Sequence, residues 1–175
     1  MNLIFRMLRL LLWRNKLAKI DPLDISHSHI SVWPLDCDFN LHLTNSRYPA
    51  LLDLARTQYL VQINALSLFV GGGWKSVLSS QSISFIKEIK PFAKVDITTQ
   101  VLYWDRKYCY IEHKFLVADK LHAKALARVA FIKGRRVRAF DKLLTVLDEN
   151  SSVQSPIETE QITAWLSLLE SKKSY

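Results

Sequence analysis

Five residues whose side chains can do chemistry lie close together between positions 36 and 45, namely Asp36, Cys37, Asp38, His42 and Asn45. They fall between a segment of strand-like alternation and one of helical periodicity. A loop that leads into a helix can hold a carboxylate near free backbone N–H groups, which polarise a carbonyl or bind an anion. Such a carboxylate can act as a general base or attack an acyl carbon. The same residue types also form ordinary turns and caps, so both interpretations stay open at this point.

The elements that must position these residues follow from periodicity. Residues 24–33 alternate as a strand, and residues 46–63 carry apolar side chains at helical spacing. After the only glycine cluster, Gly71 to Gly73, four strand-like runs with short connections follow. They cover residues 79–89, 94–105, 107–118 and 122–133. This order predicts an α+β fold in which one long helix packs on one curved antiparallel sheet of about five strands.

Both ends of the chain add a predicted helix. Residues 1–19 read as a basic amphipathic helix, which lies either on an anionic membrane surface or on the domain or a partner. It is too short and too charged to span a bilayer, and no signal-peptide cleavage site follows. Near the other end, Ser155 to Glu158 has the pattern of a helix start with a capping box. We therefore expect an N-terminal helix at 1–20, a domain at 21–147, and a linker with a C-terminal helix at 148–175.

Composition narrows the class of protein. The 175 residues are 49% hydrophobic and 23% charged, which excludes a disordered chain, and no heptad or collagen repeat is present. Two cysteines without a C-x-x-C pair favour a reducing compartment, so we expect a cytoplasmic protein, peripheral at a membrane if residues 1–19 bind one. The net charge of +8 favours anionic partners. Nucleic acid is not expected, because the basic clusters lack interleaved aromatic residues.

Other arrangements of reactive residues are weak. His27 and His29 lie two apart on a strand, but no third ligand stands at a suitable spacing, so no metal site is expected. Cys37 is a nucleophile candidate only if His42 serves as its base. The basic run Lys133-Gly134-Arg135-Arg136 follows the last strand and is either a phosphate-binding turn or a solvated one.

The run from Asp36 to Tyr48, continued by Leu52 to Arg56, resembles the signature of the hotdog-fold acyl-CoA thioesterases. These are the 4-hydroxybenzoyl-CoA thioesterase-like proteins, and the similarity is to their "thioesterase superfamily member" branch. In this family a D-x-D element precedes a His-x-x-Asn element, an aromatic residue and the central helix. The resemblance covers about residues 24–135. It implies a hotdog fold with additional terminal helices, paired into a homodimer or a dimer of dimers.

The resemblance also implies roles for single residues. Asp38 would be the general base or nucleophile, and His42 and Asn45 would line the same cleft. Tyr48 would contact substrate from the start of the helix. Leu41 stands where many catalytic members have glycine, and it would narrow the approach to Asp38. Further substrate-binding candidates are Gly72 and Gly73, through carbonyl polarisation, and Lys133, Arg135 and Arg136, through the phosphates of coenzyme A.

The sequence therefore predicts a thioester hydrolase acting on an acyl-CoA or an acyl carrier protein. It would need no cofactor, since coenzyme A is part of the substrate. The acyl chain would lie along the central helix at a subunit interface. The alternative is a non-catalytic hotdog protein that binds acyl thioesters or lipid at a membrane surface, and a purely structural dimer is the third interpretation.

Overall fold

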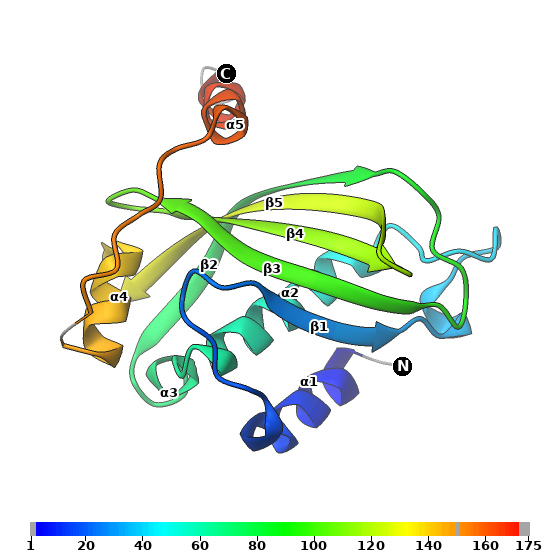
Figure 1. The fold of residues 1–175 in the computed structure, drawn as a ribbon, viewed down its shortest axis with the longest axis horizontal. Coiled ribbons are helices and arrows are strands. Elements are labelled where there is room, and N and C mark those ends of the chain that lie inside the picture. Colours follow the sequence, from blue (N-terminus) through cyan, green and yellow to red (C-terminus); the bar gives the residue numbers. More distant parts are fainter. Residues whose placement is uncertain (1–2, 150, 172–175) are drawn as a thin grey trace.

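The computed structural model describes residues 3–149 and 151–171 and shows one long helix inside a curled sheet (Figure 1). The strands are β1 (Ser26–Ser31), β2 (Trp74–Phe85), β3 (Lys94–Trp104), β4 (Cys109–Val117), β5 (Lys120–Lys133) and β6 (Arg136–Arg138). The helices are α1 (Leu3–Leu12), α2 (Arg47–Gln62), α3 (Leu66–Phe69), α4 (Phe140–Leu147) and α5 (Glu160–Ser171), with short 3-10 turns at Arg14–Lys16 and Pro34–Asp36.

The sheet is antiparallel and runs in the order β1-β3-β4-β5-β2, with β6 added to β5 beyond the end of β4. Its inner face holds α2. Alanines 123, 125 and 127 alternate along β5 and are fully buried, so the strand presents little side-chain bulk and the helix can approach closely. Along α2, Leu52 and Ala55 belong to one core cluster, with Ile97 of β3 and Phe115 of β4. Tyr59 belongs to a second cluster, with Ile111 of β4 and Val129 of β5. The predicted α+β hotdog arrangement is confirmed.

The two edges of the sheet differ. On β1, the carbonyl of His27 accepts a hydrogen bond from the Gln58 side chain at 2.6 Å, and the carbonyl of Ser31 accepts one from Arg6 at 3.1 Å. On β2, no further strand pairs with the outer edge within the described residues. Val77 and Leu78 lie in the middle of that strand with more than 40% of each side chain exposed. The β1 edge is therefore capped and the β2 edge is open.

Some predicted boundaries are wrong. The first of the four runs begins at Trp74, five residues earlier than predicted, and α3, α4 and β6 were not anticipated. The final helix begins at Glu160 and not at Ser155. The Ser155 hydroxyl instead accepts a hydrogen bond from the backbone N–H of Trp104 at 2.9 Å, and Thr159 Oγ1 accepts one from Ile162 N–H. A tertiary contact thus competes successfully with the local capping pattern.

Candidate functional site

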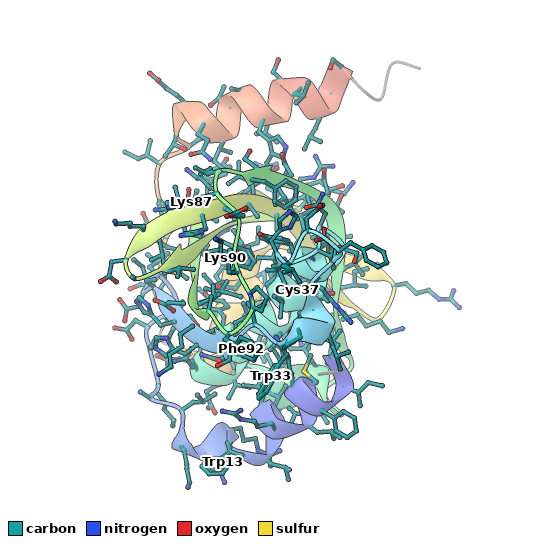
Figure 2. All side chains as sticks on the ribbon, turned by 90° about the vertical axis from the view of Figure 1, so that its right-hand side faces the viewer. Trp13, Trp33, Cys37, Lys87, Lys90 and Phe92 are labelled. Carbon is teal, nitrogen blue, oxygen red and sulfur yellow. The ribbon has the colours of Figure 1, made fainter. Side chains whose placement is uncertain are left out.

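A tight loop carries Asp38, directly after Cys37, which Figure 2 labels on the side that faces the viewer. Cys37 and Leu43 form an isolated antiparallel bridge, and the N–H of Asp38 donates to the carbonyl of His42 at 3.1 Å. The N–H of Leu41 donates back to the carbonyl of Asp38 at 3.0 Å. Leu41 closes the turn with a φ of 57°, in the left-handed region. The loop then leads into α2, so Asp38 is held just before the start of the central helix.

A backbone hydrogen bond orients the carboxylate of Asp38, and no basic side chain of the described lysines and arginines pairs with it. Its Oδ1 accepts a hydrogen bond from the backbone N–H of Asn40 at 2.9 Å, and the Nδ1 of His42 lies 3.5 Å away. The side chain is 32% exposed, so water and substrate can reach it. No ion pair joins it to a lysine or arginine within the described residues. A carboxylate in this state can take a proton from water or attack an acyl carbon.

The other aspartate of the D-x-D element, Asp36, has a structural role. Asp36 is buried, and its Oδ2 accepts hydrogen bonds from Arg6 and from the N–H of Trp33. The Nε of Arg47 lies 3.7 Å from Oδ1. Asp36 therefore fixes the loop to α1 and to the first residue of α2. Its arginine partner could not be predicted from local pattern, because Arg6 is 30 residues away in the chain.

Tyr48 forms part of the apolar wall at this end of α2. It is buried, and its ring packs at 4.9 Å on the rings of Phe85 and Phe115. Burial raises the pKa of Tyr48 to about 12, so its hydroxyl stays protonated. Asn45 and Leu41 are exposed on the loop nearby, with His42 half-buried beside them. The structure thus joins Asp38, Leu41 and His42 in one loop, which is followed by Asn45 and then by Tyr48 in the first turn of α2.

The remaining predicted substrate contacts lie at the other end of α2. Gly72 precedes β2, and its carbonyl accepts a hydrogen bond from the Lys133 ammonium at the end of β5. Its N–H donates to Ser67, and a Cβ at this position would come within 2.5 Å of the Leu68 backbone. The 16 residues of α2 span about 24 Å. Within one chain, the structure therefore does not bring Gly72, Gly73, Lys133, Arg135 or Arg136 to Asp38.

Two lysines that the sequence analysis missed lie at the Asp38 end. Lys87 and Lys90 are exposed on the connection between β2 and β3, and Figure 2 shows them on the same face of the molecule as Cys37. The N–H of Leu43 donates to the carbonyl of Ile89 at 2.7 Å, which ties this connection to the Asp38 loop. The run Lys87-Glu88-Ile89-Lys90 was the available signal, but it resembles any solvated strand end.

Two other kinds of chemistry at this loop are a cysteine nucleophile and a metal ion, and the described residues favour neither. Burial, with Asp36 and Asp38 adding to it, raises the pKa of the Cys37 thiol, which opposes formation of a nucleophilic thiolate. No group of three or more histidine, cysteine, aspartate or glutamate side chains in the described ranges could hold a metal ion. The carboxylate of Asp38 is therefore the candidate reactive group.

Replacing Leu41 with glycine tests the strain in this loop. A φ of 57° costs an L-residue about 1 kcal/mol or more, and glycine removes that cost. Leu41 is 69% exposed, so little burial is lost. We expect Leu41→Gly to raise the free energy of unfolding by about 0.5–1 kcal/mol in urea titrations. Leu41→Ala, which keeps the strain, should give no such gain, and a destabilised glycine variant would contradict the argument.

Comparison with known proteins agrees with this architecture. Residues 32–165 match the model of the Thioesterase-like superfamily. The chain is 31% identical over 85 residues to the probable thioesterase YBR096W of Saccharomyces cerevisiae, covering 48% of this chain and 37% of that protein. It is 26% identical over 137 residues to protein THEM6 of Xenopus laevis, covering 77% and 64% respectively. The chain thus spans between about one third and two thirds of the length of these relatives.

Solved structures with the same fold include the DHNA-CoA thioesterase of Staphylococcus aureus, at 15% identity and a TM-score of 0.60, covering 75% of this chain and 98% of that one. The probable thioesterase YbaW of Escherichia coli gives 18% identity and a TM-score of 0.62, covering 69% and 94%. A central helix inside a curled antiparallel sheet defines a hotdog fold. With the family match over most of its length, the chain belongs to the thioesterase-like superfamily.

Proposed function

We propose that this protein hydrolyses an acyl thioester of coenzyme A or of an acyl carrier protein, with Asp38 as general base or nucleophile. The observation that carries the proposal is the accessible Asp38 carboxylate, without a basic counter-ion, at the start of α2. Family membership supports it, because two relatives that match this chain are named thioesterases.

As general base, Asp38 would take a proton from water while the water oxygen bonds to the thioester carbon. The carbonyl becomes an oxyanion, which the backbone N–H groups of Ser46 and Tyr48 at the start of α2 are suited to hold, since a helix leaves its first donors without intrahelical acceptors. The next donors are not available, because the N–H of Arg47 donates to the carbonyl of Thr44 and Pro49 has no N–H. Collapse of the intermediate breaks the C–S bond, and the thiolate takes the proton back from Asp38. His42 and Asn45 would orient the carboxylate and the substrate, and Tyr48 would bound the acyl side of the cleft.

The anionic part of coenzyme A has a plausible place in the same chain. Lys87 and Lys90 lie on the connection that is hydrogen-bonded to the Asp38 loop. Charge-assisted hydrogen bonds from lysine to phosphate suit this position. We therefore propose these lysines as phosphate contacts in addition to the basic turn at Lys133, Arg135 and Arg136, which lies at the other end of α2.

The direct test is thiol release, followed with a thiol-reactive dye, across short, medium, long and aromatic acyl-CoAs. Release from at least one class is expected, and its profile would define the substrate. Absence of release from every acyl-CoA and from acyl carrier protein substrates, with folded protein, would overturn the proposal.

A homodimer formed through the open β2 edge would complete the site. Antiparallel pairing of two β2 strands about their middle would place the start of one strand, Trp74, beside the end of the other, Phe85. Phe85 packs on Tyr48. The partner's Gly72 and Lys133 would then lie near Asp38 of the first chain. This proposal reunites the two groups of predicted site residues that a single chain separates.

Charges placed on the β2 edge should prevent this pairing. Val77→Lys/Leu78→Lys is expected to convert a dimer to a monomer in analytical ultracentrifugation and to lower thiol release at least about tenfold, because an edge lysine repels its symmetry mate. Val146→Lys, on the exposed side of α4, is the matched control and should change neither quantity. A monomeric wild-type protein, or a dimer that survives the substitutions, would count against pairing through β2.

The membrane-associated alternative rests on the orientation of α1. The charged side chain of Arg6 is buried, whereas Ile4, Phe5, Leu8 and Leu12 are each at least 50% exposed. An apolar surface of this kind on a basic helix suits the interface of an anionic bilayer. No helix in the described part of the chain is long and apolar enough to cross a membrane.

Substitution tests this contact better than deletion, because removing residues 1–19 would also take Arg6 from Asp36. Phe5→Ser/Leu12→Ser is expected to lower the partition coefficient onto vesicles containing anionic lipid at least about 100-fold, as measured by sedimentation, since each buried apolar side chain contributes about 1.5–3 kcal/mol. The control Ile157→Ser alters an exposed apolar residue away from α1. Equal sedimentation of all three proteins would remove the membrane contact.

A further inference from the structure

A second cavity lies away from the Asp38 loop, between α1 and the edge of β1. Its volume is about 380 Å³, within the range of small-molecule sites. Arg6, Arg9 and Trp13 line it from the N-terminal segment, and β1 and α2 supply the opposite wall. Figure 1 shows α1 running alongside β1 and α2, and Trp13 and Trp33 lie on this side of the molecule in Figure 2. None of the lining residues belongs to the loop from Asp38 to Asn45.

The lining of the cavity has a basic part and a separate apolar part. Two arginines and two histidines contribute to it, and no aspartate or glutamate does. The carboxylate of Asp96 lies outside the lining and pairs with His27 and His29 at 2.6 and 3.5 Å, so the histidines have a counter-ion of their own. The apolar part consists of Leu10, Leu17, Ile30 and Leu54 with the two tryptophans.

Buried donors in the lining lack acceptors. Arg6 uses its Nη2 for Asp36 and Ser31, but its Nε and Nη1 are buried and have no hydrogen-bond partner in the described part of the chain. The hydroxyl of Ser28, on β1, is in the same state. Leaving such groups unpaired is costly, and an oxygen entering between α1 and β1 would give them an acceptor.

We propose that this cavity binds an anionic amphiphile, an acyl chain that ends in a carboxylate or a phosphate. The head group would accept hydrogen bonds from Arg6 and Ser28, with the exposed Arg9 at the mouth, and the chain would lie against the apolar part of the lining. Such a ligand can come from solution as a free fatty acid or acyl phosphate, or from a bilayer that contacts the outer face of α1. The site is independent of thioester hydrolysis.

Quenching of tryptophan fluorescence by 12-bromododecanoate, at concentrations below micelle formation, tests the site. Quenching is expected for the wild-type protein and for Asp38→Asn, and it should largely disappear in Trp13→Phe/Trp33→Phe. The neutral 12-bromododecanol should bind at least about tenfold more weakly, because the arginines recognise the charge. Equal quenching by the alcohol, or quenching that survives the loss of both tryptophans, would overturn the proposal.

Matched variants separate the pocket from general attraction to a basic protein. Arg9→Glu should weaken binding about tenfold, whereas Arg14→Glu makes the same charge change in the same segment outside the lining and should stay within about twofold. Ser28→Ala should raise the melting temperature of the free protein and yet weaken binding. An equal loss in Arg9→Glu and Arg14→Glu would contradict a specific site.

A third experiment distinguishes a ligand taken from a bilayer from one taken from solution. Protein mixed with vesicles containing brominated phosphatidate is separated from them by sedimentation and assayed for retained lipid. Retained phosphatidate would identify a bilayer source, and quenching by dodecanoate without retention would identify a soluble one. If neither probe binds, the cavity is not an amphiphile site, whatever the outcome of the thiol-release assay.

Discussion

Asp38→Asn is expected to lower kcat for thioester hydrolysis by at least about 100-fold while leaving the free energy of unfolding within about 1 kcal/mol of the wild-type value. Asparagine keeps the size of the side chain and an oxygen that can accept the hydrogen bond from Asn40 N–H, so the loop should keep its shape. It removes the carboxylate that would accept a proton from water or attack the acyl carbon. Thiol-release kinetics, with urea titration of the same samples, measure both quantities.

Asp53→Asn is the matched control for this experiment. Asp53 lies on α2 with its side chain 59% exposed, and it pairs with Arg56 one turn later. It therefore offers a second accessible carboxylate on the element that positions the site. We expect its replacement to change kcat less than about threefold. Loss of turnover in Asp53→Asn with turnover intact in Asp38→Asn would move the reactive carboxylate from the loop to the helix.

Breaking the Arg6–Asp36 pair should have the largest effect on stability. Both side chains are at most 5% exposed, so removing the arginine leaves a buried carboxylate with the N–H of Trp33 and the Nε of Arg47, 3.7 Å away, as its remaining partners. Losing one partner of a buried pair costs about 3–5 kcal/mol. We expect a loss of this size for Arg6→Met in urea unfolding, out of a total of about 5–15 kcal/mol for a domain.

The control for this prediction is Arg9→Met, because Arg9 is exposed on the same helix. It should cost less than about 0.5 kcal/mol. The double variant Arg6→Met/Asp36→Asn should recover part of the loss, since no charge then remains buried. A cost below about 1 kcal/mol for Arg6→Met alone would mean that α1 is not anchored by this pair.

The sequence predicted the parts of the molecule that depend on local pattern. The long helix predicted at 46–63 corresponds to α2, and the proposed base lies in a loop before it. Both features could be predicted because apolar periodicity and turn chemistry are properties of neighbouring residues in the sequence. It could not predict contacts between distant segments. For example, His113 of β4 is fully buried between Thr99 and Arg56, which lie on β3 and α2. Burial and the neighbouring guanidinium lower its pKa, so it stays neutral.

The candidate site shows the same limit. Asp38, His42 and Asn45 are neighbours in sequence and in space. The glycines and the basic turn were grouped with them because of the chemistry they could supply, but the length of α2 separates the two groups in one chain. The symmetric partner that the family resemblance implies would bring them together.

The unequal edges of the sheet also limit how large an assembly can grow. A sheet with two open edges can add copies indefinitely, as fibres do. Here Gln58 and Arg6 occupy backbone acceptors along β1, which leaves β2 as the edge available for another strand. When two copies join through that edge about a two-fold axis, the β2 edge of each copy pairs with that of the other. The combined sheet then ends at a β1 edge on both sides. Self-association through the proposed β2 pairing would therefore terminate at two chains, and polymerisation would be opposed by the same side chains that hold α1 and α2 against β1.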